Sequence, residues 1–306
     1  MNYQKWGVLA LAVVVAACAG GEEAEPTVAA GPTLPPGTDV FLATLSVDAQ
    51  GMPEMGALDN ATNRAGYDNQ PYFTPDGSGF WYTVVDDHTG QADIYRYDME
   101  PETVAQITST NPESEYSATP LPDGSGLSVI RVEADSLQRL WRLDTDGSNG
   151  EVLLPELAPV GYHKWADDQT LVMFVLGSPA TLRMGNVNTG AVETIAESVG
   201  RSIHLIPGSD DLSFVQRHED GSSTIMRLDP MTGTVESIVD AVDGGDFHAW
   251  TPAGVLLQGN ETKLFAWTAD SDGWQEVADF ADQRIAISRL AVSPTGGHIT
   301  IVGEAN

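Results

Sequence analysis

The chain has 306 residues, of which 42% are hydrophobic, enough to bury the core of one large domain or of two smaller ones. Its 44 acidic and 14 basic residues give a formal net charge of −30 at pH 7. So negative a protein repels nucleic acid and anionic lipid surfaces, and we expect neither as a direct partner. The single cysteine, Cys18, excludes an intrachain disulfide.

The first 17 residues have the pattern of an export signal. Lys5 supplies a positive charge, residues 8–15 form a short apolar run, and two alanines precede Cys18. The run is shorter than the roughly 20 residues that span a bilayer. The sequence Val-Ala-Ala-Cys at residues 15–18 resembles the lipobox of a bacterial lipoprotein. This resemblance implies cleavage before Cys18 and lipidation of its thiol.

Residues 18–38 are rich in Pro, Gly and Glu and lack apolar periodicity, which is typical of a flexible tether. Residue 19, directly after the cysteine, is Ala. An Asp at this position would resemble the signal that retains a lipoprotein at the inner membrane. By this resemblance, we expect the protein to be exported and anchored by its lipid in the outer membrane, facing the periplasm. The lipid would be its only contact with the membrane.

Two strands are expected directly after the tether. Residues 39–45 form a strong apolar run, and a weaker strand follows a turn, at about residues 55–58. Neither strand belongs to the repeats that begin at residue 71, so both are surplus to the repeat count.

A hairpin turn sets the period of the remaining chain. In Pro75-Asp76-Gly77, proline presets φ, Asp can bond the backbone ahead of it, and glycine accepts positive φ. Related turns recur at steps of 40 to 47 residues, which is the period of propeller blades. The turns that follow the first one start at Pro122, Asp167, Pro207, Pro252 and Pro294.

Short apolar runs between these turns predict units of four strands, and we expect no long helix. The second strands are expected at residues 80–85, 127–132, 171–176, 212–216, 255–257 and 299–302. The last unit stops after two strands, and the two surplus strands in residues 39–60 can complete it. We therefore predict an all-β, six-bladed β-propeller in residues 39–306, with four-stranded antiparallel blades and a last blade closed by the N-terminal strands.

The stretch Pro-Tyr-Phe-Thr-Pro-Asp-Gly at residues 71–77, with its aromatic second strand and Asp-Ile-Tyr-Arg-Tyr-Asp at residues 93–98, resembles TolB-type β-propeller repeats of bacterial exported proteins. The resemblance covers nearly all of residues 39–306 and weakens in the third to fifth units. It implies a binding scaffold for a protein, peptide or glycan of the cell envelope. Repeats of this type also accompany peptidases and other hydrolases, so the motif specifies a blade and not a ligand.

The sequence contains no His-Glu-x-x-His, no Gly-x-Ser-x-Gly, no phosphate-binding glycine loop and no Cys-x-x-Cys. We therefore interpret the protein as a non-catalytic, monomeric interaction scaffold and predict no cofactor. The alternative is a hydrolase or lyase with a metal-assisted site in the central channel, held by His163 and His248. A purely structural envelope protein is a third interpretation that the sequence does not separate from the first.

Several residues are candidates for a binding site at the mouth of the channel. His163 and His248 occupy equivalent places at the start of innermost strands, with His204 one step later than its equivalent. They either converge on the channel or are packing residues of separate blades. Tyr116, Glu115 and Arg201 are expected at the rim, and the equivalent residues Ile203 and Leu290 beside the same opening.

Four arginines recur at one repeat position: Arg96, Arg142, Arg183 and Arg227. They either form a basic ring or, as we favour, each crosses between blades to pair with an acidic residue or a carbonyl.

Overall fold

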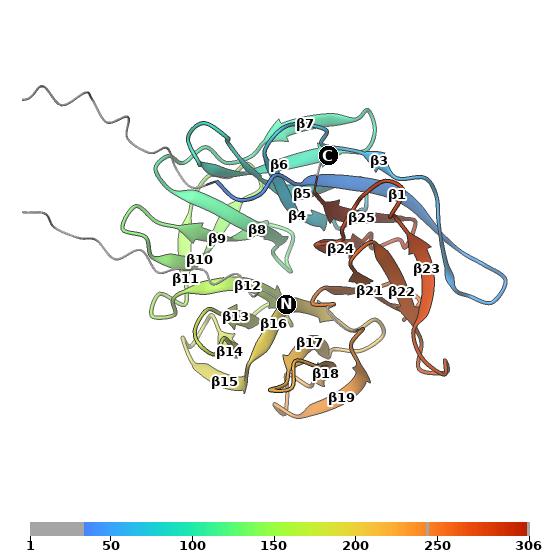
Figure 1. The fold of residues 1–306 in the computed structure, drawn as a ribbon. Coiled ribbons are helices and arrows are strands. Elements are labelled where there is room, and N and C mark those ends of the chain that lie inside the picture. The colour runs from blue at the N-terminus through green and yellow to red at the C-terminus, as the bar shows by residue number, and fades with distance from the viewer. Residues whose placement is uncertain (1–33, 243–244, 305–306) are drawn as a thin grey trace, which may run out of the picture. The chain divides into compact units, whose positions relative to one another are not determined.

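The computed structural model describes residues 34–242 and 245–304 (Figure 1). All regular elements in these residues are β-strands, and no described helix is long and apolar enough to cross a membrane. The predicted signal peptide, Cys18 and most of the predicted tether lie outside the described residues. The description that follows concerns the compact unit that starts at Pro32.

Five blades are consecutive antiparallel sheets of four strands, ordered from the channel outward. The first blade contains β4 (Tyr67–Phe73), β5 (Gly79–Val85), β6 (Ala92–Asp98) and β7 (Thr103–Gln106). The second contains β8 (Ser114–Pro120), β9 (Gly126–Val132), β10 (Gln138–Asp144) and β11 (Glu151–Leu153). The third contains β12 (Val160–Trp165), β13 (Thr170–Val175), β14 (Thr181–Asn186) and β15 (Val192–Glu197). The fourth contains β16 (Val199–Leu205), β17 (Leu212–Arg217), β18 (Ser223–Leu228) and β19 (Val235–Asp240). The fifth contains β20 (His248–Trp250), β21 (Leu256–Asn260), β22 (Lys263–Trp267) and β23 (Gln275–Asp279).

The sixth blade joins the two ends of the unit, as predicted. Its inner strands are β24 (Arg289–Val292) and β25 (His298–Gly303), and β1 (Asp39–Val47) pairs antiparallel with β25 over six residues. Figure 1 shows blue β1 beside dark red β25. This pairing confirms the six-bladed propeller and its closure by the N-terminal strands.

The outermost position of this blade differs from the expectation. The strand expected at residues 55–58 is split into β2 (Pro53–Met55) and β3 (Asp59–Asn60), and both pair with β1. Gly56 lies between them, with its N–H bonded to the Thr44 carbonyl at 3.0 Å. A Cβ on Gly56 would meet the Thr44 hydroxyl at 2.2 Å, so only glycine fits this close approach to β1 between the two short strands.

The hairpin turn that sets the repeat has the expected geometry. The Asp76 carboxylate accepts hydrogen bonds from the backbone N–H and the hydroxyl of Ser78, and Gly77 has φ of +71°. Gly124, Gly254 and Gly296 end equivalent turns with φ between +72° and +84°. The local sequence therefore fixes each reversal from the innermost strand to the second strand of its blade.

The hydrophobic core lies between neighbouring blades. In one cluster, Val40 and Val302 of the sixth blade pack with Phe80 and Tyr97 of the first, and the rings of Phe80 and Tyr97 stack at 5.1 Å. Burial between blades requires every blade to have two neighbours, so stability depends on a closed ring.

Three of the four recurring arginines pair with acidic residues of their own blade, contrary to the favoured interpretation, and the fourth, Arg183, donates to the Thr181 hydroxyl of its own strand. Arg96 pairs with Asp98 of the same strand at 2.7 Å, Arg142 with Glu151 of the next strand, and Arg227 with Asp211. These acidic partners belong to the same blade because neighbouring strands bring them closer than the adjacent blade does.

The closure can be tested through its register. Thr44 and His298 are direct partners in the β1–β25 ladder. In a chain carrying Cys18→Ser, the pair Thr44→Cys and His298→Cys should form a disulfide, because direct partners lie within the distance that a disulfide spans. Crosslinking should raise the free energy of unfolding by about 2–4 kcal/mol, measured by denaturant unfolding under oxidising and reducing conditions.

The matched control combines Thr44→Cys with Thr300→Cys, two residues out of register. Its thiols are diagonal neighbours and should crosslink poorly. Equal crosslinking of both pairs would contradict the register, and no crosslinking of the in-register pair would contradict the closure.

Candidate functional site

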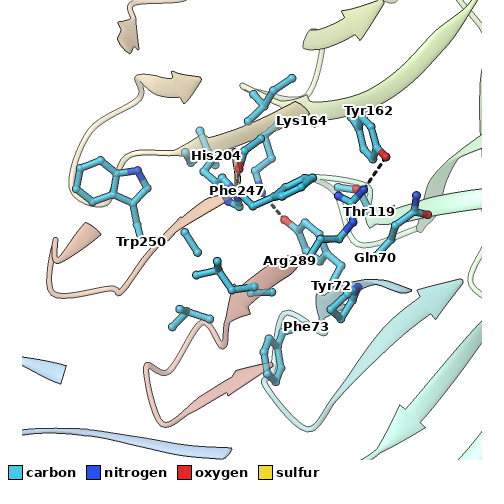
Figure 2. Close-up of a pocket in the computed structure, with 18 of the residues that line it drawn as sticks. Gln70, Tyr72, Phe73, Thr119, Tyr162, Lys164, His204, Phe247, Trp250 and Arg289 are labelled. Carbon is cyan, nitrogen blue, oxygen red and sulfur yellow. Dashed lines mark hydrogen bonds between the residues drawn. The ribbon is translucent and has the colours of Figure 1, made fainter. Parts of the chain in front are cut away.

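The innermost strands of all six blades, β4, β8, β12, β16, β20 and β24, contribute to one cavity of about 280 Å³ in the channel (Figure 2). Pro207, Pro252 and Pro294 of the hairpin turns line one end of it. Gln70, Arg201 and Phe247 lie toward the starts of the innermost strands and line the other.

The repeat alignment sorts the cavity wall into two tiers, each with one residue per blade. The first tier consists of Gln70, Ser117, Tyr162, Ser202, Phe247 and Arg289. The second tier, two residues further along each strand, consists of Tyr72, Thr119, Lys164, His204, Ala249 and Ala291. In β12 the pairing is regular from Tyr162 to Lys164, and side chains two residues apart in such a strand point to the same side, so both face the channel.

The cavity is basic although the protein is strongly acidic. Lys164, Arg201 and Arg289 line it, and none of the lining residues is an Asp or Glu. Eight other basic residues of the described chain form ion pairs with carboxylates: Arg64, Arg96, Arg131, Arg139, Arg142, Arg217, Arg227 and Lys263. The three cavity residues form no ion pair with any described carboxylate. Their charge is therefore left for an anion that enters the cavity.

Arg289 is held rigidly at the first tier. Its Nη2 donates to the Tyr162 hydroxyl at 2.6 Å, and its guanidinium lies 4.7 Å from the Tyr162 ring centre and 4.4 Å from that of Phe247. Burial raises the pKa of the Tyr162 phenol, but the nearby Arg289 and Arg201 outweigh it and the pKa is lowered. The hydrogen bond and the two rings position the guanidinium, and its remaining N–H groups form the kind of fork that binds a carboxylate or phosphate.

Lys164 occupies the second tier. Its ammonium donates to the Tyr72 hydroxyl and lies 4.7 Å from the Tyr72 ring centre (Figure 2). Beside it, the imidazole of His204 is hydrogen-bonded through Nε2 to Ser202 at 3.0 Å. Burial, with smaller contributions from His248 and Lys164, holds the pKa of His204 well below its usual value. His204 therefore adds a neutral polar group and leaves the positive charge of this tier to Lys164.

His163 and His248 bond neighbouring blades together. His163 Nε2 lies 2.6 Å from the Ser128 hydroxyl of the preceding blade, and Trp165 Nε1 donates to the same hydroxyl at 2.9 Å. His248, Trp250 and Ser213 repeat this arrangement at 2.8 and 2.9 Å. We call each arrangement a His–Trp–Ser clamp. His163 forms part of the cavity wall, whereas His248 is fully buried outside it.

Of the other residues expected at the channel mouth, some line the cavity and some do not. Arg201 and the apolar Ile203 and Leu290 line the cavity. Glu115 is fully buried instead, where its carboxylate accepts from Arg131 at 2.8 Å and from Thr110 at 2.6 Å. Tyr116 packs half-buried against the core cluster between the second and third blades. Neither residue lines the cavity, because Arg131 holds Glu115 within the second blade and the apolar cluster takes up Tyr116 between the second and third blades.

Sequence reasoning missed Lys164, Arg289, Tyr162 and Tyr72. Each lies one residue away from a position that the repeat alignment had singled out: Lys164 and Tyr162 flank His163, and Arg289 precedes Leu290. The rarity of lysine was a signal, since Lys164 is one of three in the chain. Within the described residues, no three His, Cys, Asp or Glu side chains are grouped as metal ligands would be.

Removing a clamp hydroxyl should destabilise the fold. Ser128→Ala would leave buried Trp165 Nε1 without an acceptor and His163 Nε2 without a partner, at a cost of about 2–3 kcal/mol in the free energy of unfolding. Urea unfolding would measure the loss. Ser125→Ala, in an exposed turn of the same blade, is the matched control and should cost much less. Equal losses would show that the clamp does not join the blades.

The clamp also predicts a pH dependence of stability. Burial lowers the pKa of His248 from 6.5 to about 3, so between these values the unfolded chain binds a proton that the folded chain does not. The free energy of unfolding should therefore fall below pH 6.5, by about 1.4 kcal/mol per pH unit for this histidine. Asp68, whose pKa burial raises to about 6, acts in the opposite direction.

His248→Gln isolates the contribution because Asp68 is common to both proteins. Urea unfolding at pH 7.5, 6.5 and 5.5 should give the variant a shallower loss of stability on acidification than the parent. Parallel profiles would mean that His248 is protonated in the folded protein.

No protein-family model and no curated protein matches the sequence. Solved structures with a similar fold include a TolB-like protein from Agrobacterium tumefaciens, with a TM-score of 0.66 and 12% identity over 88% of this chain and 99% of the other. TolB from Acinetobacter baumannii has a TM-score of 0.54 and 14% identity over 88% of this chain, which spans 64% of that structure. An oligogalacturonate lyase from Vibrio parahaemolyticus has a TM-score of 0.51 and 13% identity over 87% of this chain and 98% of the other. These likenesses concern the fold, and they place the chain among six-bladed propellers that include TolB-like proteins.

Proposed function

We propose that the protein is a non-catalytic, lipid-anchored binding scaffold of the bacterial cell envelope. Its channel cavity captures an anionic group, a carboxylate or a phosphate, carried by a protein, peptide or glycan. The observation that carries this proposal is the set of three cations, Lys164, Arg201 and Arg289, that line one cavity without a described acidic partner.

Electrostatics favour an anion at this place. Each of the three cations repels the other two, and inside a partly closed cavity this repulsion is weakly screened by solvent. An entering anion relieves the repulsion, and it replaces water at donors that are already oriented by Tyr72, Tyr162 and Phe247. Elsewhere the acidic surface repels the same anion, so capture is confined to the channel.

The cellular context is supported by sequence and fold together. The lipobox-like segment at residues 15–18 supports export and attachment through Cys18. The likeness to TolB structures supports an envelope location of the propeller and a role as a scaffold. We accordingly propose the outer membrane, on its periplasmic side, as the place where the scaffold works.

The alternative, a metal-assisted hydrolase or lyase around His163 and His248, has less support from the contacts. Both imidazoles use Nε2 to bind a buried serine, and His248 does not line the cavity. The oligogalacturonate lyase shares the fold at 13% identity, which does not extend to its activity.

Calorimetric titration of the full-length protein tests the capture of an anion. Hexanoate and inorganic phosphate serve as probes at low ionic strength. We expect measurable binding that weakens at least tenfold in Arg289→Gln, because the stacked guanidinium fork is lost, and that weakens as salt is added. Arg96→Gln, which removes an arginine already paired with Asp98 outside the cavity, should leave binding unchanged.

Thermal unfolding of each variant would show that it is folded before its affinity is compared. Binding of neither probe by the parent would refute the proposed function. If the parent and Arg289→Gln bind the probes with equal affinity, the anion binds outside the cavity, and the proposed function is refuted as well.

A further inference from the structure

We propose that the cavity takes a linear ligand with two anionic groups, one held at each tier, and not a ligand with a single anionic group. This inference rests on the proposed function and deepens it by stating the chemical class of the ligand. Its basis is the placement of Arg289 and Lys164 at two successive levels of the same channel wall.

The spacing of the two cations follows from β12. Tyr162 and Lys164 are two residues apart on this strand, and Arg289 is bonded to Tyr162. Two residues of strand advance the chain by about 6.6 Å. The backbone positions that anchor the two cations, Tyr162 for the guanidinium and Lys164 itself for the ammonium, are thus separated by about this length along β12. Arg201 precedes the first tier on β16 and adds charge at the same end as Arg289.

Both anchored cations have donors to spare. The Lys164 ammonium has three N–H donors and gives one to Tyr72, and the Arg289 guanidinium has five and gives one to Tyr162. Both partners are tyrosine hydroxyls and not carboxylates, so neither cation is in an ion pair with an acidic residue. Each level can therefore take a carboxylate of its own.

The second tier also provides space. Lys164 belongs to the third blade, and the residue of the opposite blade at this tier is Ala291, with Ala249 beside it in the fifth blade. At the first tier the equivalent position of the sixth blade is Arg289, which reaches across the channel to Tyr162 (Figure 2). The small side chains at the second tier leave room for the body of a ligand between Lys164 and the opposite wall.

A ligand with two anionic groups gains more here than two separate anions. A single anion at either tier leaves the other cation uncompensated in the cavity. Joining both anions in one molecule also means that the loss of translational freedom is incurred once for two charge-assisted contacts. At about 280 Å³ the cavity is slightly below the usual range of small-molecule sites, which favours a short ligand or the end of a longer one.

Two sources can offer this chemistry. One is a free α,ω-dicarboxylate. The other is an extended peptide with acidic residues at positions i and i+2, whose side chains share one side and have the same spacing as the tiers. The shared requirement is two carboxylates separated by about two strand residues, and the experiment has an arm for each source.

The test is a calorimetric series on the full-length protein with malonate, glutarate, pimelate and azelate, and with hexanoate as the single-anion reference. We expect affinity to pass through a maximum at intermediate length, at least tenfold tighter than hexanoate. Lys164→Met should abolish this advantage while hexanoate still binds at Arg289. The charge-retaining variant Lys164→Arg should keep most of it, which separates lost charge from a disturbed fold.

Two further arms locate the ligand and its source. Ala291→Leu, which fills the second tier without changing charge, should weaken pimelate more than hexanoate. Acetyl-Asp-Ala-Asp-amide should bind more tightly than acetyl-Asp-Asp-Ala-amide, whose adjacent carboxylates point to opposite sides. If the protein prefers acetyl-Asp-Ala-Asp-amide and binds no free dicarboxylate, the result would support two anion positions and identify a peptide as the ligand.

The outcomes separate this inference from the proposed function. Hexanoate binding as tightly as every dicarboxylate and both peptides, with no selective effect of Lys164→Met, would overturn the pairing and leave capture of a single anion standing. Binding of no probe at all, phosphate included, would overturn both.

Discussion

The antiparallel pairing of β1 with β25 is the constraint on which the rest of the structure depends. A blade exposes an apolar face on each side, and the clusters that bury these faces lie between blades. Only a closed ring gives every face a partner and leaves no unpaired inner edge. Closure also decides the site, because it brings β24 next to β4 and holds Arg289 of the last blade across the channel from Tyr162 of the third.

The basic residues fall into two groups, those in ion pairs outside the channel and those that line the cavity. Outside the channel, eight basic residues of the described chain are matched by carboxylates, as Arg131 is by Glu115 and Arg139 by Glu133. Within the channel, aromatic rings and phenol groups take the place of carboxylates around Lys164 and Arg289. An aromatic partner orients a cation without neutralising it, so the field of the cation remains available to a ligand. The cavity wall thus contains three basic and no acidic residues in a chain whose formal net charge is −30.

The repeat predicted the fold because its turn residues determine the backbone conformation of their own short segment. A Pro-x-Gly turn, present in four of the six units, favours a reversal by itself, and counting these turns with the two related ones gave six blades and the missing strands of the last one. The orientation of the innermost strands was less accessible. A shift of one residue exchanges the face toward a neighbouring blade for the face toward the channel, so His163 and Lys164, adjacent in sequence, have different tasks.

Irregularities in the ladders explain why this phase could not be read from the sequence. The pairing register shifts between Asn69 and Tyr72 in β4, and between Tyr116 and Thr119 in β8. Gln70 and Ser117, which lie within these shifts, have φ of +58° and +55° and belong to the first tier. Such bulges re-aim the residues on either side, and they depend on contacts between strands that no short sequence pattern records. Glu115 and Tyr116, which precede one of these bulges, do not line the cavity: Glu115 is bonded to Arg131 and Tyr116 packs between the second and third blades.

The alternation along the innermost strands separates stability from recognition. The residues between the tiers, such as His163 and His248, bind adjacent blades through buried serines and tryptophans, and replacing them endangers the fold. The second-tier residues Thr119, Ala249 and Ala291 are not part of these clamps, and their side chains border the cavity. Ala249 is also part of a buried apolar cluster, whereas Ala291 is half-buried, so a substitution at Ala291 changes the shape of the channel without touching a clamp. Because the two sets interleave on one strand, the same hydrogen-bonded ladder that fixes the clamps also fixes where each tier residue points.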